Sequence, residues 1–199
     1  MEDTHRKCRI TDLIPTQVSV GMREVGFKRR RWREKGGRDA ASFKRHRIPV
    51  IIGPEAQHYL IDRHHFARAL HDEGVADVPV TIVADMRTLA LDEFWAALER
   101  WNWVRPFDDK GKRCDYGRIP TSVACLRDDP FRSLASMLRR AGGYAKNKAP
   151  FSEFRWADFL RRHITSKTVA YDFDRALTLA MYWSRRPEAA GLPGWLGIC

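Results

Sequence analysis

The chain has 199 residues, 44% of them hydrophobic, and a formal net charge of +11 at pH 7, so it can bury one sizeable core or a main domain with a smaller appendage. No stretch has the length and apolar composition of a membrane-spanning helix or a secretory signal, and four scattered cysteines suit neither a disulfide framework nor a zinc knuckle. We therefore expect a cytoplasmic protein with reduced thiols and no membrane partner.

The first third of the chain alternates strand and helix patterns. A strand that contains a proline near its end is expected over residues 8–17, and residues 21–35 predict a helix that stops at a glycine pair. Residues 48–52 and 58–61 predict two short strands, and the turn at 53–55 is typical of a hairpin connection.

The next segment predicts a helix followed by a strand. Phe66, Ala69 and Leu70 occupy i, i+3 and i+4, so they form the buried side of a helix that begins near Arg63. Residues 78–83 alternate weakly, which favours a strand covered on both faces. Strand, helix and strand together have the size of a crossover unit.

From residue 91 the pattern becomes helical and rich in aromatic side chains. The stripe is expected to pack in a core rather than to stack nucleobases, and it consists of Phe94, Trp95, Leu98, Trp101 and Trp103.

A turn-rich segment at 105–113 predicts a boundary. We expect a core domain over residues 1–105 and a helical C-terminal extension over 106–199 that packs on the core. Helices in this extension are expected at 130–141, 154–163 and 169–183.

Polar chemistry is concentrated where the strand at 58–61 gives way to a helix. Asp62 is placed to act as the N-cap, and His64 and His65 add donors, acceptors or proton carriers. The N–H groups of a first helical turn favour anions, so phosphate is the expected ligand class. The alternative is an ordinary capping acid beside two solvated histidines.

Basic residues are dense between Lys28 and Arg47, where ten of them stand against two acidic residues, an excess of eight positive charges. Such a basic belt attracts polyphosphate or a nucleic-acid backbone without sequence preference. A solvated, solubilising surface is the alternative.

The motif Asp62-x-His64-His65, followed by Ala67 and Leu70, resembles the signature turn of the ParB/sulfiredoxin superfamily, and specifically its ParB-like nuclease family. The order of strands and helices over about residues 6–105 is also similar to that family. The resemblance implies an α+β fold, a small mixed sheet with flanking helices, to which the helical tail is added.

The turn also departs from other branches of the superfamily. Partition proteins carry a phosphate-gripping Gly-Glu-Arg-Arg turn where this chain has Arg63-His64-His65-Phe66, which argues against a CTP-gated clamp. Sulfiredoxins need a cysteine where this chain has His64. Free-serine kinases place a catalytic glutamate about where Gln17 stands, and an amide cannot act as a general base.

These arguments give a set of candidate site residues. The candidate catalytic residues are Asp62, His64 and His65. Phosphate or nucleic acid is expected to contact Arg23, Lys28, Arg30, Arg31, Arg45, Arg63 and Arg68. Further pocket residues are Thr16, Gln17 and Glu24. No metal site is predicted, and the sequence leaves open whether a nucleotide or a divalent metal serves as cofactor, as well as the oligomeric state.

The leading hypothesis is a ParB-like protein that binds nucleic acid or a nucleotide at this turn and acts as a phosphodiesterase or nuclease. A non-catalytic module that binds DNA or a partner protein is the second hypothesis. Nucleotide-dependent phosphorylation of a small metabolite is the third.

Overall fold

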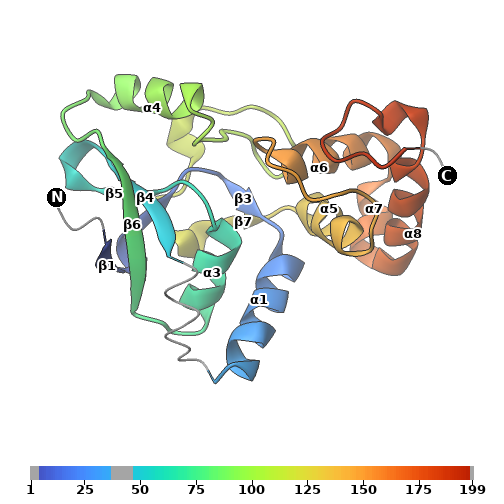
Figure 1. Cartoon of the computed structure of the whole chain (residues 1–199), viewed down its shortest axis with the longest axis horizontal. Coiled ribbons are helices and arrows are strands. Elements are labelled where there is room, and N and C mark those ends of the chain that lie inside the picture. The colour runs from blue at the N-terminus through green and yellow to red at the C-terminus, as the bar shows by residue number, and fades with distance from the viewer. Residues whose placement is uncertain (1–4, 37–46, 198–199) are drawn as a thin grey trace. The chain divides into compact units, whose positions relative to one another are not determined.

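The computed structural model describes residues 5–36 and 47–197, and its chain divides into two compact units (Figure 1). The first unit takes Met1–Val20 and Val25–Arg127, and the second takes Gly21–Glu24 and Asp128–Cys199. The first unit therefore extends to Arg127, and the second contains the C-terminal residues together with Gly21–Glu24. Basic-belt residues 37–46 lie outside the described residues.

The first unit contains a mixed five-stranded sheet, which confirms the α+β fold class. Its strands, in spatial order, are β1 (His5–Arg9), β6 (Asp77–Asp85), β4 (Ile48–Ile52), β5 (His58–Leu60) and β2 (Leu13–Pro15). β1 is antiparallel to β6, β6 is parallel to β4, β4 is antiparallel to β5, and β5 is parallel to β2.

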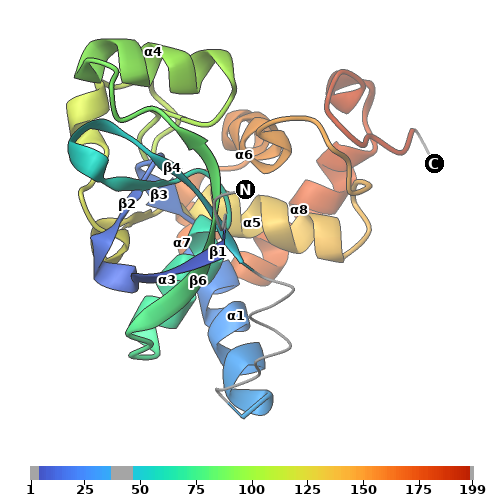
Figure 2. The ribbon, with the colours of Figure 1, turned by 60° about the vertical axis from the view of Figure 1, so that its left-hand side comes forward.

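The expected strand over residues 8–17 is broken by a 3-10 turn, η1 (Ile10–Asp12), and its two halves form opposite edges of the sheet. The edge strands of a flat five-stranded sheet would be about 19 Å apart. Four residue steps span at most about 14 Å when extended, and about 8 Å in a 3-10 turn. The sheet must therefore curl, as Figures 1 and 2 show.

The predicted hairpin of β4 and β5 is confirmed, with the 3-10 turn η2 (Pro54–Ala56) between the strands. The predicted crossover is wrong, because a crossover joins parallel strands and β5 runs antiparallel to β6. The helix α3 (His64–Asp72) instead leads to a strand that lies on the other side of β4. The expectation of a doubly covered strand is also wrong, since β6 buries Val78 and Val80 but leaves Val83 46% exposed.

Helices α1 (Met22–Glu34) and α4 (Leu91–Arg100) form where the sequence predicts them. On α4, Phe94, Trp95 and Leu98 are buried, as expected. Trp101 is 61% exposed, because α4 ends at Arg100 and Trp101 is only its C-cap residue.

The second unit is built from α5 (Pro130–Arg140), α6 (Ser152–His163), α7 (Ser166–Tyr171) and α8 (Phe173–Ser184). Its core includes Phe131, Leu134, Leu138, Trp156 and Leu160. The single helix expected over 169–183 is divided at Asp172, whose carboxylate accepts a hydrogen bond from the Arg175 backbone N–H and caps α8.

The remaining elements are short. They are β3 (Ser19–Val20), β7 (Arg127–Asp128), η3 (Tyr116–Arg118), η4 (Val123–Cys125) and η5 (Pro187–Ala189). Among the helices of residues 5–36 and 47–197, none has the length and apolar character to cross a bilayer.

Candidate functional site

The turn that precedes α3 has a different cap from the one expected. Arg63, not Asp62, is the N-cap residue, and its backbone is left-handed, with φ 66° and ψ 26°. The Arg63 carbonyl accepts the first intrahelical bonds, from Phe66 N at 2.8 Å and Ala67 N at 2.9 Å. Asp62 stands one residue too early to cap α3, and its Oδ1 accepts from Arg63 N at 2.6 Å.

His64 joins this turn to the end of β2. Its imidazole is only 6% exposed, and Nε2 accepts a hydrogen bond from the Thr16 backbone N–H at 3.1 Å. The Thr16 hydroxyl in turn donates to the Leu60 carbonyl at 2.8 Å. A nitrogen that accepts from an N–H carries no proton, so His64 is a neutral imidazole protonated on Nδ1. In this geometry His64 positions the turn.

The other side chains of the turn reach the surface. Asp62 is exposed, while Arg63 and His65 are half-buried. A carboxylate, an imidazole and a guanidinium thus surround the start of α3, and these groups can orient water, transfer a proton and bind an anion.

Of the three expected pocket residues, Thr16 contacts His64, and Gln17 follows Thr16 in the chain. Thr16 and Gln17 are both buried, and the Gln17 Nε2 atom has no hydrogen-bond partner among the described residues. Glu24 instead belongs to the second unit, where it accepts hydrogen bonds from Ser136 Oγ at 2.9 Å and Arg140 Nη2 at 2.7 Å. That ion pair is internal to the second unit.

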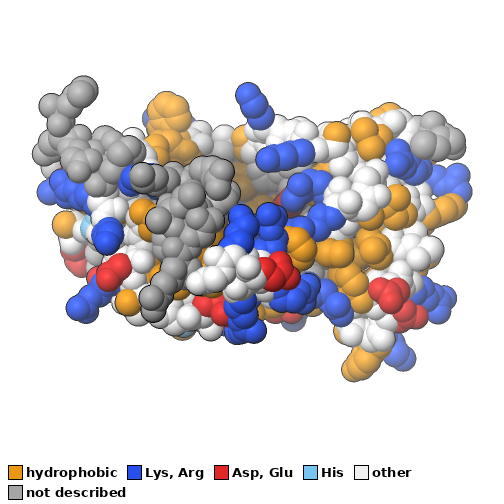
Figure 3. Space-filling model, turned by 60° about the horizontal axis from the view of Figure 1, so that its bottom comes forward, with side chains coloured by type: hydrophobic (Ala, Val, Ile, Leu, Met, Phe, Trp, Pro, Cys, Tyr) orange, Lys and Arg blue, Asp and Glu red, His pale blue; other side chains and the backbone are white. Residues whose placement is uncertain are grey.

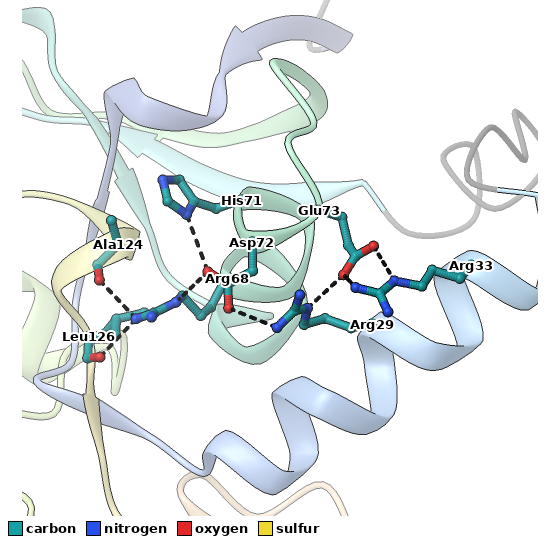
Figure 4. Close-up of polar contacts among 8 residues, drawn as sticks. All are labelled: Arg29, Arg33, Arg68, His71, Asp72, Glu73, Ala124 and Leu126. Atoms are coloured by element: carbon teal, nitrogen blue, oxygen red, sulfur yellow. Dashed lines mark hydrogen bonds and ion pairs between the residues drawn. The ribbon is translucent and has the colours of Figure 1, made fainter.

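Arg68, expected to contact phosphate, is engaged within the first unit (Figure 4). Its Nη1 donates to the carbonyls of Ala124 at 2.9 Å and Leu126 at 3.0 Å, and its Nε donates to Asp72 at 2.9 Å. The guanidinium therefore holds the segment around η4 against α3.

The basic belt is partly neutralised by a carboxylate at the end of α3 (Figure 4). Glu73 accepts from Arg29 Nε and Arg33 Nε, each at 2.6 Å. The guanidinium groups of Arg33 and Arg29 hold the Glu73 carboxyl in its charged form and lower its pKa to about 2. No local sequence pattern indicates this pairing, because Glu73 follows the two arginines by 44 and 40 positions.

The remaining residues that were expected to contact phosphate do not all lie in the same part of the structure. Arg30 and Arg31 are exposed on α1, and Lys28 is half-buried there. Arg23 lies in the second unit, 3.9 Å from the centre of the Phe173 ring. Arg45 lies outside the described residues. Lys and Arg side chains are prominent on the face drawn in Figure 3.

Within the described part of the chain, no group of three or more His, Cys, Asp or Glu side chains could hold a metal ion. Cys8, Cys114 and Cys125 are free thiols.

Comparisons with known proteins agree with the fold. Residues 6–162 match the profile of a family described as "Putative ParB-like nuclease". The crystal structure of protein Atu1540 from Agrobacterium tumefaciens is similar, with 46% sequence identity, a TM-score of 0.92, and coverage of 99% of this chain and 100% of that one. A search of the curated proteins found no match. Because the family profile covers most of the chain, including the turn at Asp62–His65, this protein belongs to the ParB-like nuclease family.

Proposed function

We propose that this protein binds a phosphate-bearing ligand, nucleic acid or a nucleotide, at the Asp62–His65 turn, and that it cleaves phosphodiester bonds there. The observation that carries the proposal is the grouping of a carboxylate, an imidazole and a guanidinium at the start of α3, on a turn where the Arg63 backbone is left-handed, at φ 66°. A non-glycine residue in this region costs about 1–2 kcal/mol. Such strain persists where the surroundings impose it, and it is concentrated at ligand-binding sites.

The surroundings here include the bond between His64 Nε2 and Thr16 N. A buried imidazole that fixes the turn leaves Asp62 and His65 at the start of α3, where the helix dipole favours a negatively charged ligand.

The proposed chemistry follows from the side-chain types of Asp62, Arg63 and His65. Asp62 would orient the attacking water or accept its proton, His65 would protonate the leaving oxygen, and Arg63 would stabilise the developing negative charge. Membership of a family described as nucleases supports this reaction class.

The test is cleavage of single-stranded DNA, double-stranded DNA and nucleoside triphosphates by the purified protein, with and without added divalent cations. Asp62→Asn and His65→Ala should each lower kcat by about 100-fold or more, the usual effect of losing a general acid or base. His58→Ala is the matched control, because it removes a half-buried histidine on β5 and should leave cleavage unchanged. Unchanged turnover in both turn variants would reject the catalytic role.

A non-catalytic nucleic-acid-binding module is the second candidate, favoured by the exposed Arg30 and Arg31 of α1. This function predicts DNA binding that survives Asp62→Asn and His65→Ala but weakens steeply with salt. Kinase chemistry receives no comparable support, because the buried Gln17 amide cannot accept a proton.

A further inference from the structure

The first unit contains a polar cavity, and none of its lining residues belongs to the Asp62–His65 turn. Its volume is 330 Å³. The lining residues are Val18, Gly117, Arg118, Ile119, Pro120, Thr121, Cys125 and Arg127. Two of them carry positive charge and none is acidic.

One wall of the cavity is fixed by η3 and the residues after it. Ile119 is only 7% exposed and packs in the same core cluster as Phe94 and Trp95. Tyr116, the first residue of η3, stacks on Trp95 with ring centroids 5.3 Å apart and donates a hydrogen bond to the Glu99 carboxylate. This wall is therefore held by the core.

The part of the lining that contains Cys125 is fixed by hydrogen bonds on both sides of this residue. Arg68 donates from α3 to the carbonyls of Ala124 and Leu126, the two neighbours of Cys125 (Figure 4). The Arg127 backbone N–H donates to the Val18 carbonyl at 3.0 Å. The Cys125 thiol itself is exposed.

Arg118 and Arg127 are the charged residues in the lining of this cavity, and no acidic residue lines it. The side chains of Arg118 and Arg127 are exposed, and neither forms an ion pair with any residue of the described ranges. Guanidinium groups match the geometry of phosphate oxygens and bind them with charge-assisted hydrogen bonds. The Thr121 hydroxyl, also at the lining, can donate one more.

We propose that this cavity is a binding site for a small phosphomonoester, which Arg118 and Arg127 hold by its phosphate group. Two guanidinium groups match the two negative charges of a phosphomonoester at neutral pH. A volume of 330 Å³ is at the lower end of small-molecule sites, which suits a ligand no larger than a mononucleotide. The proposal does not depend on the function proposed for the Asp62–His65 turn.

Cys125 provides a direct readout of occupancy, because a ligand in the cavity would cover its thiol. The experiment measures the rate of iodoacetamide alkylation at each cysteine by peptide mass spectrometry, with AMP, inorganic phosphate or a short single-stranded oligonucleotide without terminal phosphates. AMP should slow alkylation of Cys125 at least threefold. Inorganic phosphate should also protect Cys125 at higher concentration. No protection by AMP at millimolar concentration, or protection by the oligonucleotide alone, would overturn the proposal.

The role of Arg118 and Arg127 in binding the phosphate group is tested by measuring AMP binding to variants of each by calorimetry. Arg118→Gln and Arg127→Gln should each weaken binding about tenfold, as expected for loss of a hydrogen bond to a charged group. Arg100→Gln, at the exposed end of α4, is the charge-matched control and should have no effect. Equal weakening by all three variants would show a general charge effect and reject the site. DNA cleavage should persist in the cavity variants, so this test and the test of the turn can fail separately.

Discussion

At the scale of single residues, His64 decides how the turn before α3 is held. Its buried Nε2 is the acceptor for the Thr16 N–H, so any replacement must either supply an acceptor or leave a buried donor without one.

We expect His64→Ala to lower the free energy of unfolding by about 2–3 kcal/mol, because a buried donor loses its partner and a cavity forms. His64→Gln should recover part of this loss, since Gln Oε1 can occupy a position close to that of His Nε2. Urea unfolding of both variants measures the effect, with His58→Ala as the control. Equal destabilisation by Ala and Gln would contradict the role of the hydrogen bond.

The carboxyl group of Glu73 is expected to make the free energy of unfolding depend on pH. Its pKa is about 2 in the folded protein and 4.5 as the ordinary value, because Arg33 and Arg29 stabilise the charged form. Because the pKa is lower in the folded protein than in the unfolded chain, the charged carboxylate stabilises the fold. This contribution is fully present above pH about 4.5 and is lost as the pH falls toward about 2.

Glu73→Gln should therefore destabilise the protein by about 1 kcal/mol at pH 7, a modest value because Arg33 is largely exposed to water. The difference from the unmodified protein should shrink as the pH is lowered from 5 to 2. Urea unfolding across this range is the measurement, and a difference that stays constant with pH would reject the assignment.

At the scale of elements, replacing glycine by alanine is expected to change stability in opposite directions at two positions. Gly53 is tightly packed, whereas Gly26 has open space around it. A Cβ atom at Gly53, between β4 and η2, would lie 2.5 Å from Tyr59 Cε2 and 2.8 Å from Phe94 Cζ. A Cβ at Gly26, inside α1, would meet no atom within 4 Å.

Gly53→Ala should cost about 1–3 kcal/mol, because two core rings must move. Gly26→Ala should stabilise the protein by about 0.5–1 kcal/mol, because alanine loses less backbone entropy in a helix. Thermal or urea unfolding of the two variants measures these changes in stability. A change of the same sign in both variants would contradict the placement of Gly53 against the core rings and of Gly26 in open space.

At the scale of the whole molecule, positive charge is spread over both units. Residues 128–199 carry twelve basic and seven acidic side chains, which is five of the eleven net charges. Binding to a nucleic-acid backbone should therefore depend strongly on salt, whichever function the turn performs.

Exposed arginines and arginines that form ion pairs should contribute differently to this salt dependence. Arg30→Gln should reduce the slope of log binding constant against log salt concentration by about 0.9 on double-stranded DNA, as expected for one lost phosphate contact. Arg33→Gln should change the slope less, because Glu73 already pairs with that guanidinium. Fluorescence-anisotropy titrations at several salt concentrations measure both slopes, and equal slope changes would contradict the distinction.

The sequence by itself determined most of the elements, because strand alternation, helical periodicity and glycine stops are local patterns. The fold class followed from the resemblance of the Asp62–His65 turn and of the element order to a known family. It predicted the hairpin of β4 and β5, the helices α1, α4 and α5, and the concentration of polar residues at Asp62–His65.

Only the tertiary structure decided how strands distant in sequence pair and which charged side chains form ion pairs. The placement of β1 and β2 at opposite sheet edges, the insertion of β4 between β5 and β6, and the pairing of Glu73 with Arg29 and Arg33 all join residues distant in sequence. It likewise showed that His64 is buried against Thr16, which lies 48 positions earlier. Such contacts depend on how the chain closes on itself, and a periodic pattern carries no information about that closure.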